Sequence, residues 1–216
     1  MMEENRQLLH EIAVQCEKGD ADAVRSLTVE ALEHCSAESI LNQGLMSGME
    51  CIGVKFKNNE VFIPEVLIAA RAMKAGMAVL KPRLAEARVA SKGKILMGTV
   101  KGDLHDIGKN IVSMLLQGAG FEVVDMGTDV GVETIIQMIR ETEPQILGLS
   151  ALLTTTMICM EDVIKGLEKA GLRDRIKVII GGAPITQAYA DEIGADGYAP
   201  DAAVSVDLVR GLLASV

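Results

Sequence analysis

An imidazole stands two residues after a carboxylate in the segment Gly102-Asp103-Leu104-His105-Asp106-Ile107-Gly108. Histidine is the commonest metal ligand, and a carboxylate at this spacing can accept the N–H of the other ring nitrogen and so fix the tautomer. Gly108 lets a bulky ligand approach the backbone closely. The segment could therefore bind a metal through His105, although spacing alone favours a surface capping pair.

The number of histidines limits what kind of metal site this can be. His10 and His34 are the other two histidines, and both lie in a part of the chain with helical spacing. A bare metal bound by several imidazoles is therefore not expected. A metal that brings its own equatorial ligands needs one axial residue, and a corrin ring supplies such ligands. The segment also lacks the glycine patterns of dinucleotide-binding loops and P-loops.

The elements around this segment alternate between two periodicities. Short β-branched runs predict strands at 94–100, 122–126, 145–150 and 177–180 and near Gly197. Helical spacing predicts helices near 107–118, 131–142, 157–170, 184–192 and 201–214. This βαβ alternation predicts an α/β, Rossmann-like (flavodoxin-like) five-stranded parallel sheet with helices on both faces. Such sheets bind ligands at the carboxyl ends of their strands, where the Asp103 segment begins.

The first part of the chain shows helical spacing without strand-like alternation. Gly19 ends a first helix, Asp20 and Ser36 can cap a second and a third, and Pro64 can begin a fourth. Four helices with short links predict an all-α four-helix bundle. The change of pattern at 82–93, with Pro82 and a polar stretch, predicts a linker. We expect domains at 1–88 and 89–216.

Composition narrows the classes of function. The chain has 21 basic and 30 acidic residues, a net charge of −9, which argues against nucleic-acid binding. It has no Trp, two Tyr and three Phe, so platforms for base stacking are scarce. Apolar runs fall short of the roughly 20 residues of a membrane span, and the acidic N-terminus is unlike a signal peptide. Four scattered cysteines fit a reducing compartment, so we expect a cytoplasmic protein without a membrane partner.

The run from Gly102 to Asn110 resembles the DxHxxG signature shared by methionine synthase, corrinoid methyl carriers and B12 mutases. The resemblance implies that His105 is the lower axial ligand of cobalt in cobalamin or a related corrinoid. Asp103 would orient the imidazole, and Thr156 would complete the relay where methionine synthase has serine. The extra methyl group of Thr156 leaves that geometry open.

Two further strand ends carry the same resemblance. The stretch Ser150–Thr156 is similar to the family's SxL motif, and Gly181-Gly182 is similar to its GG motif. These motifs would line the slot for the nucleotide tail of the cofactor, and the region that includes Ala202 would close it. The cofactor-binding residues implied in the sheet half are Gly102, Asp103, His105, Asp106, Ile107, Gly108, Ser150, Leu152, Thr154, Gly181, Gly182 and Ala202.

The helical half resembles the cap that methionine synthase-like proteins place over the upper face of the corrin. The string from Phe56 to Glu65 is similar to the family's cap string, and Phe56 and Ile63 match residues that shield the methyl group. Ordinary core packing at a helix junction is the alternative for both residues. Gly44 and Gly48, one turn apart, are expected to permit close helix packing.

The resemblance implies a non-catalytic, cofactor-carrying subunit of a cobalamin-dependent methyltransferase system in one-carbon metabolism. It would alternate between methylcob(III)alamin and cob(I)alamin. Its implied partners are a substrate:corrinoid methyltransferase, a second methyltransferase with a tetrahydrofolate or thiol acceptor, and a reductive activating protein. The similarity extends from about residue 3 to 214, which leaves no room for a substrate barrel of roughly 250 residues.

Three other functions stay open on the sequence. A subunit of an adenosylcobalamin mutase shares DxHxxG but generally lacks the helical cap. A B12-sensing regulator carries a similar cap, but joined to a DNA-binding helix-turn-helix domain. A cofactor-free flavodoxin-like protein would leave His105 without a role.

Overall fold

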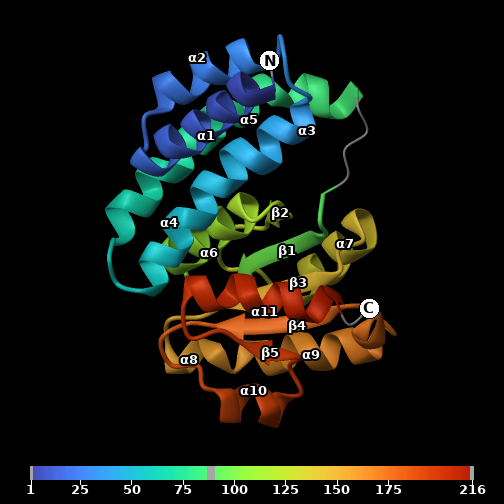
Figure 1. Ribbon diagram of the computed structural model, residues 1–216. Helices are drawn as coiled ribbons and strands as arrows, with labels where there is room; N and C mark the ends of the chain where they lie inside the picture. Colours follow the sequence, from blue (N-terminus) through green and yellow to red (C-terminus); the bar gives the residue numbers. More distant parts are fainter. Residues whose placement is uncertain (1, 87–90, 215–216) are drawn as a thin grey trace. The chain divides into compact units, whose positions relative to one another are not determined.

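The computed structural model describes residues 2–86 and 91–214 (Figure 1). They form two compact units. The helical unit comprises Met1–Ser91 with Gln117–Gly120, and the sheet unit comprises Lys92–Leu116 with Phe121–Val216. The domain boundary expected between residues 88 and 89 lies outside the described residues and stays a prediction.

The helical unit consists of α1 (Met2–Lys18), α2 (Ala21–Ala31), α3 (Ala37–Ser39), a π-helical segment η1 (Ile40–Met46), α4 (Ser47–Lys57) and α5 (Ile63–Glu86). Two of the expected caps are formed. Asp20 accepts a hydrogen bond from the Ala23 N–H at 2.9 Å, and Ser36 accepts one from the Ser39 N–H at 3.1 Å. Each satisfies an N–H that the first turn of a helix leaves without a partner.

The third expected helix is not uniform, because α3 and α4 are joined through η1. Two glycines on this stretch face α1. A Cβ at Gly44 would lie 2.9 Å from Cγ2 of Ile12, and a Cβ at Gly48 would lie 2.5 Å from the Ala13 carbonyl oxygen. Both glycines therefore permit close helix packing, as expected from the sequence.

Pro82 corrects the prediction of where the linker begins. It lies inside α5, which continues to Glu86. Proline removes one backbone hydrogen bond from a helix, but here the loss falls within about a turn of the helix end. The local rule that proline ends a helix was therefore wrong at this position. Residues 87–90 of the expected linker lie outside the described residues.

The sheet unit contains β1 (Lys94–Thr99), α6 (Ile107–Gly118), β2 (Glu122–Asp125), α7 (Val132–Thr142), β3 (Ile146–Ser150), α8 (Thr154–Met157), α9 (Cys159–Lys169), the 3₁₀ turn η2 (Arg173–Arg175), β4 (Lys177–Gly181), α10 (Gln187–Ile193), β5 (Gly197–Tyr198) and α11 (Ala202–Ala214). The five strands are parallel in the order β2-β1-β3-β4-β5. The expected fold class is confirmed, and the expected strands match the observed ones within about two residues.

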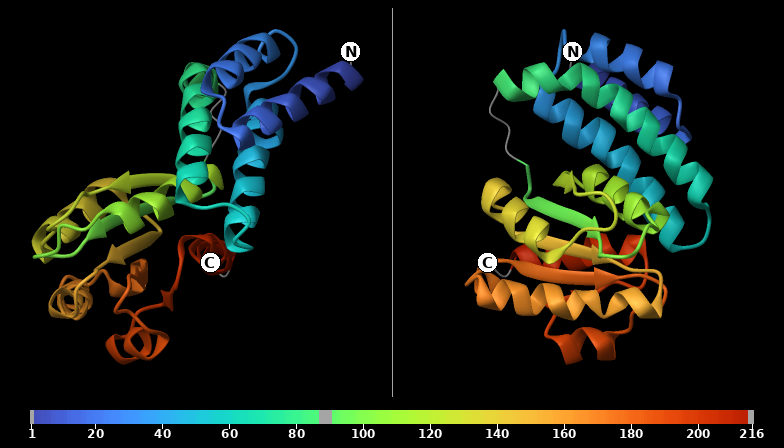
Figure 2. Two further views of the ribbon diagram at one scale, coloured as in Figure 1. Left: turned by 90° about the vertical axis from the view of Figure 1, so that its left-hand side faces the viewer. Right: turned by 180° about the vertical axis from the view of Figure 1, so that it is seen from behind.

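Helices cover both faces of this sheet (Figures 1 and 2). One face packs against α7, α9 and α10 through a cluster that includes Leu96, Leu147 and Ile180. Helix α11 lies on the opposite face (Figure 1). After β1 the chain forms β2 on one side of β1, and it then crosses over to form β3 on the other side of β1. The carboxyl ends of β1 and β3 therefore flank a topological switch point, where such sheets bind ligands.

Gly182, directly after β4, adopts a backbone conformation that side chains disfavour. Its φ is +133°, and a Cβ there would lie 1.8 Å from the Ala151 carbonyl oxygen at the end of the neighbouring strand. Glycine is thus required by the packing of two adjacent strand ends. This reason is independent of any ligand, and the role of Gly182 in a nucleotide slot stays a prediction.

We expect Gly182→Ala to lower the free energy of unfolding of the cofactor-free protein by roughly 1–3 kcal/mol, because the alanine strains this backbone. Gly108→Ala is the matched control, since a Cβ there meets nothing within 4 Å. Urea denaturation of the two variants and the parent would measure the difference. Equal midpoints for Gly182→Ala and the parent would contradict the strain.

Candidate functional site

Asp103 is a fully buried carboxylate between the loops that follow β1 and β3, with 0% of the residue exposed. Its Oδ2 accepts the Thr156 hydroxyl at 2.7 Å and the Leu152 N–H at 2.8 Å. Its Oδ1 accepts the His105 N–H at 3.0 Å. These donors satisfy the carboxylate from both loops, as burying a charged group requires.

His105 completes this cluster from the exposed side. Its Nδ1 lies 2.7 Å from Oδ1 of Asp103, while 52% of its side chain is exposed. An ionised Asp103 can only accept, so Nδ1 carries the hydrogen and Nε2 is the nitrogen able to bind a metal. Thr156, Asp103 and His105 are therefore joined by a continuous chain of hydrogen bonds, and the methyl group of Thr156 does not interrupt it.

Asp103 stays ionised at all ordinary pH values. Burial acts to raise the pKa of its carboxyl group. The hydrogen bonds from the Thr156 hydroxyl, the Leu152 N–H and His105 outweigh burial, and they hold the pKa well below the ordinary value of aspartate. The imidazole therefore faces a carboxylate that carries a negative charge.

The other residues expected at the site in the sheet unit also lie at strand ends. Register pairs Thr99 with Ser150 and Ser150 with Gly181, so the ends of β1, β3 and β4 lie side by side. The remaining expected residues follow these ends: Gly102, Asp106, Ile107 and Gly108 after β1, Leu152 and Thr154 after β3, Gly182 after β4, and Ala202 after β5. The sheet therefore brings the expected segments to one edge.

Phe56 and Ile63 belong to the helical unit. Phe56 is half-buried near the end of α4, and Ile63 begins α5 with 41% of its surface exposed. The neighbouring Phe62 is 66% exposed. Phe62 is the last residue before α5, and Ile63 is the first residue of that helix.

Two further groups support the loop after β1 and were not expected. Thr99, buried at the end of β1, donates its hydroxyl hydrogen to the His105 carbonyl at 2.9 Å. Lys109, with a side chain 1% exposed, places Nζ 2.6 Å from both carboxylate oxygens of Asp125. A Lys following the DxHxxG run was visible in the sequence, but its partner at the end of β2 was not.

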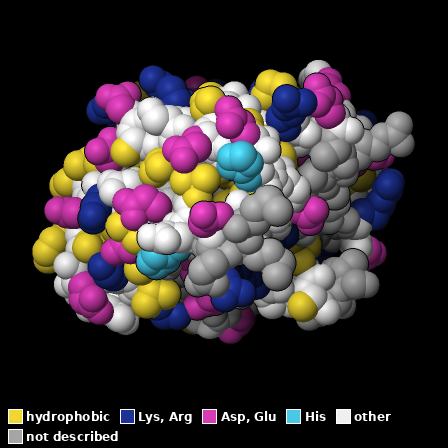
Figure 3. Space-filling view, turned by 45° about the horizontal axis from the view of Figure 1, so that its top comes forward, with side chains coloured by type: hydrophobic (Ala, Val, Ile, Leu, Met, Phe, Trp, Pro, Cys, Tyr) yellow, Lys and Arg dark blue, Asp and Glu magenta, His cyan; other side chains and the backbone are white. Residues whose placement is uncertain are grey.

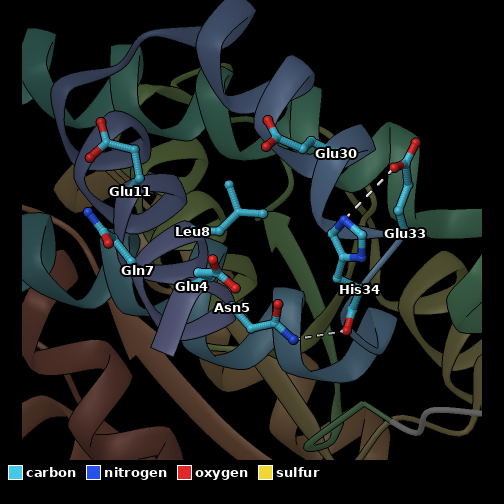
Figure 4. A pocket seen from close by; sticks show the side chains of 8 residues that line it. All are labelled: Glu4, Asn5, Gln7, Leu8, Glu11, Glu30, Glu33 and His34. Atoms are coloured by element: carbon cyan, nitrogen blue, oxygen red, sulfur yellow. Dashed lines mark hydrogen bonds and ion pairs between the residues drawn. The ribbon is translucent and has the colours of Figure 1, made fainter. Parts of the chain in front are cut away.

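The helical unit holds a cavity of about 840 Å³, which is lined mainly by acidic and amide side chains (Figure 4). Its lining is Glu4, Asn5, Gln7, Leu8, Glu11, Glu30, Glu33 and His34. Figure 3 shows acidic and apolar side chains interspersed over one face of the molecule. Within residues 2–86 and 91–214, the structure has no cluster of three or more His, Cys, Asp or Glu side chains arranged to hold a bare metal ion. The His105 cluster, in which a buried carboxylate orients an exposed imidazole, is the better candidate for a cofactor site.

Two family models match the chain. Both are described as a B12 binding domain, one over residues 93–207 and the other over residues 8–81. Two similar proteins are a corrinoid protein of Desulfitobacterium hafniense, 43% identical over 95% of this chain and 97% of its own, and a dimethylamine corrinoid protein of Methanosarcina acetivorans, 46% identical over 96% and 98%. No helix among the described residues is long and apolar enough to cross a membrane.

Solved structures of cobalamin-related proteins are also similar to this chain. The methanol:cobalamin methyltransferase complex of Methanosarcina barkeri matches with a TM-score of 0.86 and 30% identity, over 97% of this chain and 81% of the other. A cobalamin-binding protein of Desulfitobacterium hafniense matches with a TM-score of 0.77 and 33% identity, over 94% and 98%. The chain therefore belongs to the B12-binding corrinoid proteins of methyltransferase systems.

Proposed function

We propose that this protein carries a methyl group on its corrinoid between a substrate-specific methyltransferase and a second methyltransferase with a tetrahydrofolate or thiol acceptor. A reductive activating protein would restore cobalt that has been oxidised by accident. The single observation that supports this role best is the relay, in which a buried carboxylate fixes the tautomer of an exposed imidazole at the switch point of the sheet. The bound corrinoid supplies the cobalt that accepts and releases the methyl group.

The residues of the sheet unit fit such a cofactor. Because Nδ1 is directed at Asp103, the Nε2 of His105 would hold the cobalt of the corrinoid. Leu104 and Ile107, on either side of His105, are 73% and 71% exposed. Apolar side chains presented to solvent beside a lone imidazole suit a flat, largely apolar macrocycle.

The comparisons support the carrier role over its rivals. The two B12-binding models match both the helical and the sheet parts of the chain, whereas a cofactor-free protein would leave His105 without a role. The named relatives are corrinoid proteins, one of them for dimethylamine. We propose that the partner methyltransferase selects the methyl donor and that the protein works in the cytoplasm, where its free cysteines stay reduced.

The axial role of His105 can be tested by absorbance spectroscopy of the cobalamin-loaded protein. His105→Ala should shift the spectrum toward the base-off form, because the lower ligand is lost. His34→Ala is the control, since His34 is an exposed imidazole of the helical unit. The axial assignment would be wrong if both variants kept the spectrum of the parent and its rate of methyl transfer.

The relay makes a prediction about stability and pH in the cofactor-free protein. Thr156→Val removes a hydrogen bond to a buried charge, so the free energy of unfolding at pH 7 should fall by about 1–3 kcal/mol. The folded-state pKa of Asp103 lies below the unfolded-state value, so this carboxylate stabilises the fold above that value. The difference in the free energy of unfolding between Thr156→Val and the parent should therefore stay constant above about pH 4 and shrink only at lower pH.

Thr156→Ser is the matched control for this experiment, because serine keeps the hydroxyl group and loses only the methyl group. Urea denaturation at pH 7, 5 and 3.5 would compare the three proteins. If Thr156→Val and Thr156→Ser were equally stable at pH 7, the hydroxyl would not support the carboxylate.

We also propose that Phe56 and Ile63 shield the upper face of the bound corrinoid. Replacing Ile63 with Asp should then speed the loss of the bound methyl group to an added free thiol when partner proteins are absent. Val29→Asp is the control, since Val29 is also an exposed apolar residue of the helical unit, at 52%. Equal rates for both variants and the parent would identify Ile63 as a residue without a shielding role.

A further inference from the structure

The loop that carries His105 is also held from the side of β2, by Asp129. The Oδ1 of Asp129 accepts the Gly102 N–H at 2.8 Å, and the backbone N–H of Asp129 donates to the Asp103 carbonyl at 3.0 Å. Lys101 adds an ion pair, with Nζ 3.0 Å from Oδ1. One residue of the β2–α7 loop therefore binds three consecutive residues of the loop after β1.

Asp129 makes these bonds from an unusual backbone conformation. Its φ is +57°, in the left-handed region that aspartate and asparagine tolerate better than other side chains. Gly102, which it contacts, also has a positive φ, of +80°. The hydrogen bond from the Gly102 N–H, and to a smaller extent the one from Lys101, lowers the pKa of the Asp129 carboxyl group. The acceptor therefore stays charged.

The β2–α7 loop is itself tied to the end of β1. The Thr99 N–H donates to the Gly127 carbonyl at 3.0 Å, and the Val130 N–H donates to the Thr99 carbonyl at 3.0 Å. Asp125 accepts the Gly127 N–H at 2.9 Å and holds the buried Lys109 of α6. The loop that carries Asp129 is therefore bonded to β1 and, through Asp125, to α6. Asp129 can hold the Gly102 backbone because its own loop is held in place.

Asp103 is consequently held from two directions. The β3 side binds its carboxylate through Thr156 and Leu152, and the β2 side binds its backbone carbonyl through Asp129. The first contact fixes the side chain that orients the imidazole, and the second fixes the backbone. A displacement of about 1 Å at such a position is enough to impair a site of this kind.

We propose that Asp129 is a positioning residue, which holds the backbone from Gly102 to His105 in place while the imidazole engages and leaves its metal. Binding and release of a metal by the imidazole would then require rotation of one side chain and no movement of the loop. This inference rests on the proposed function for the metal, but the anchoring itself concerns the chain alone.

The test separates the carboxylate from the backbone conformation. Asp129→Gly removes the acceptor and keeps the positive φ available, while Asp129→Asn keeps both an acceptor oxygen and tolerance of that φ. Glu143→Gly is the matched control, because Glu143 is another exposed acidic residue with a positive φ, of +47°.

Two measurements are needed. In the cofactor-free protein, amide hydrogen exchange at Gly102 should be about tenfold faster in Asp129→Gly, since one hydrogen bond of the loop is lost. In the cobalamin-loaded protein at fixed pH, the ratio of imidazole-bound to base-off spectra should fall several-fold in the same variant. Asp129→Asn should restore both values most of the way, and Glu143→Gly should leave both unchanged.

Each contrary result has its own meaning. Unchanged exchange at Gly102 would overturn the anchoring, whatever the cofactor does. Faster exchange with an unchanged spectral ratio would reduce Asp129 to a residue that only stabilises the fold, and would overturn the positioning role. If His105→Ala itself left the spectrum unaltered, the axial assignment would fail and the positioning role with it, although the exchange result would stand.

Discussion

A carboxylate that is buried and still charged is the constraint on which the site depends. Removing a charge from water costs several kcal/mol unless hydrogen bonds replace the solvent, so Asp103 requires donors on every side. Those donors come from the loop after β1 and from the loop after β3. The two loops must therefore be neighbours, and the strand order, with β1 beside β3, makes them so.

The same carboxylate connects the interior of the sheet unit to its surface. Asp103 is inaccessible, whereas the imidazole that it orients is half exposed. The rigid part of the site is thus inside and the reactive part is outside, where a large ligand can reach it. Preorganising a ligand through a second layer of hydrogen bonds is the usual way in which proteins tune metal sites.

Local pattern was enough to predict the strands and most of the helices, because each depends on neighbours in sequence. For Asp103 and His105, spacing alone favoured a surface capping pair, and family resemblance gave the two residues their role at a cofactor. The Thr156 hydroxyl bonds a residue 53 positions away, and family resemblance, not spacing, identified it. Leu152 acts through its backbone N–H, which no side-chain type encodes, and Asp129 acts across two loops. The helical Pro82 was missed because the hydrogen bond that it removes falls within about a turn of the helix end, and the π-helical segment was missed as well.

The edges of the sheet have a consequence for how copies of this protein meet one another. The outermost strands, β2 and β5, are four and two residues long. Exposed edges invite strands of other molecules to add to a sheet, and very short edge strands offer too few hydrogen bonds for such growth. The short edge strands of this protein therefore keep its own copies from pairing into a continuous sheet.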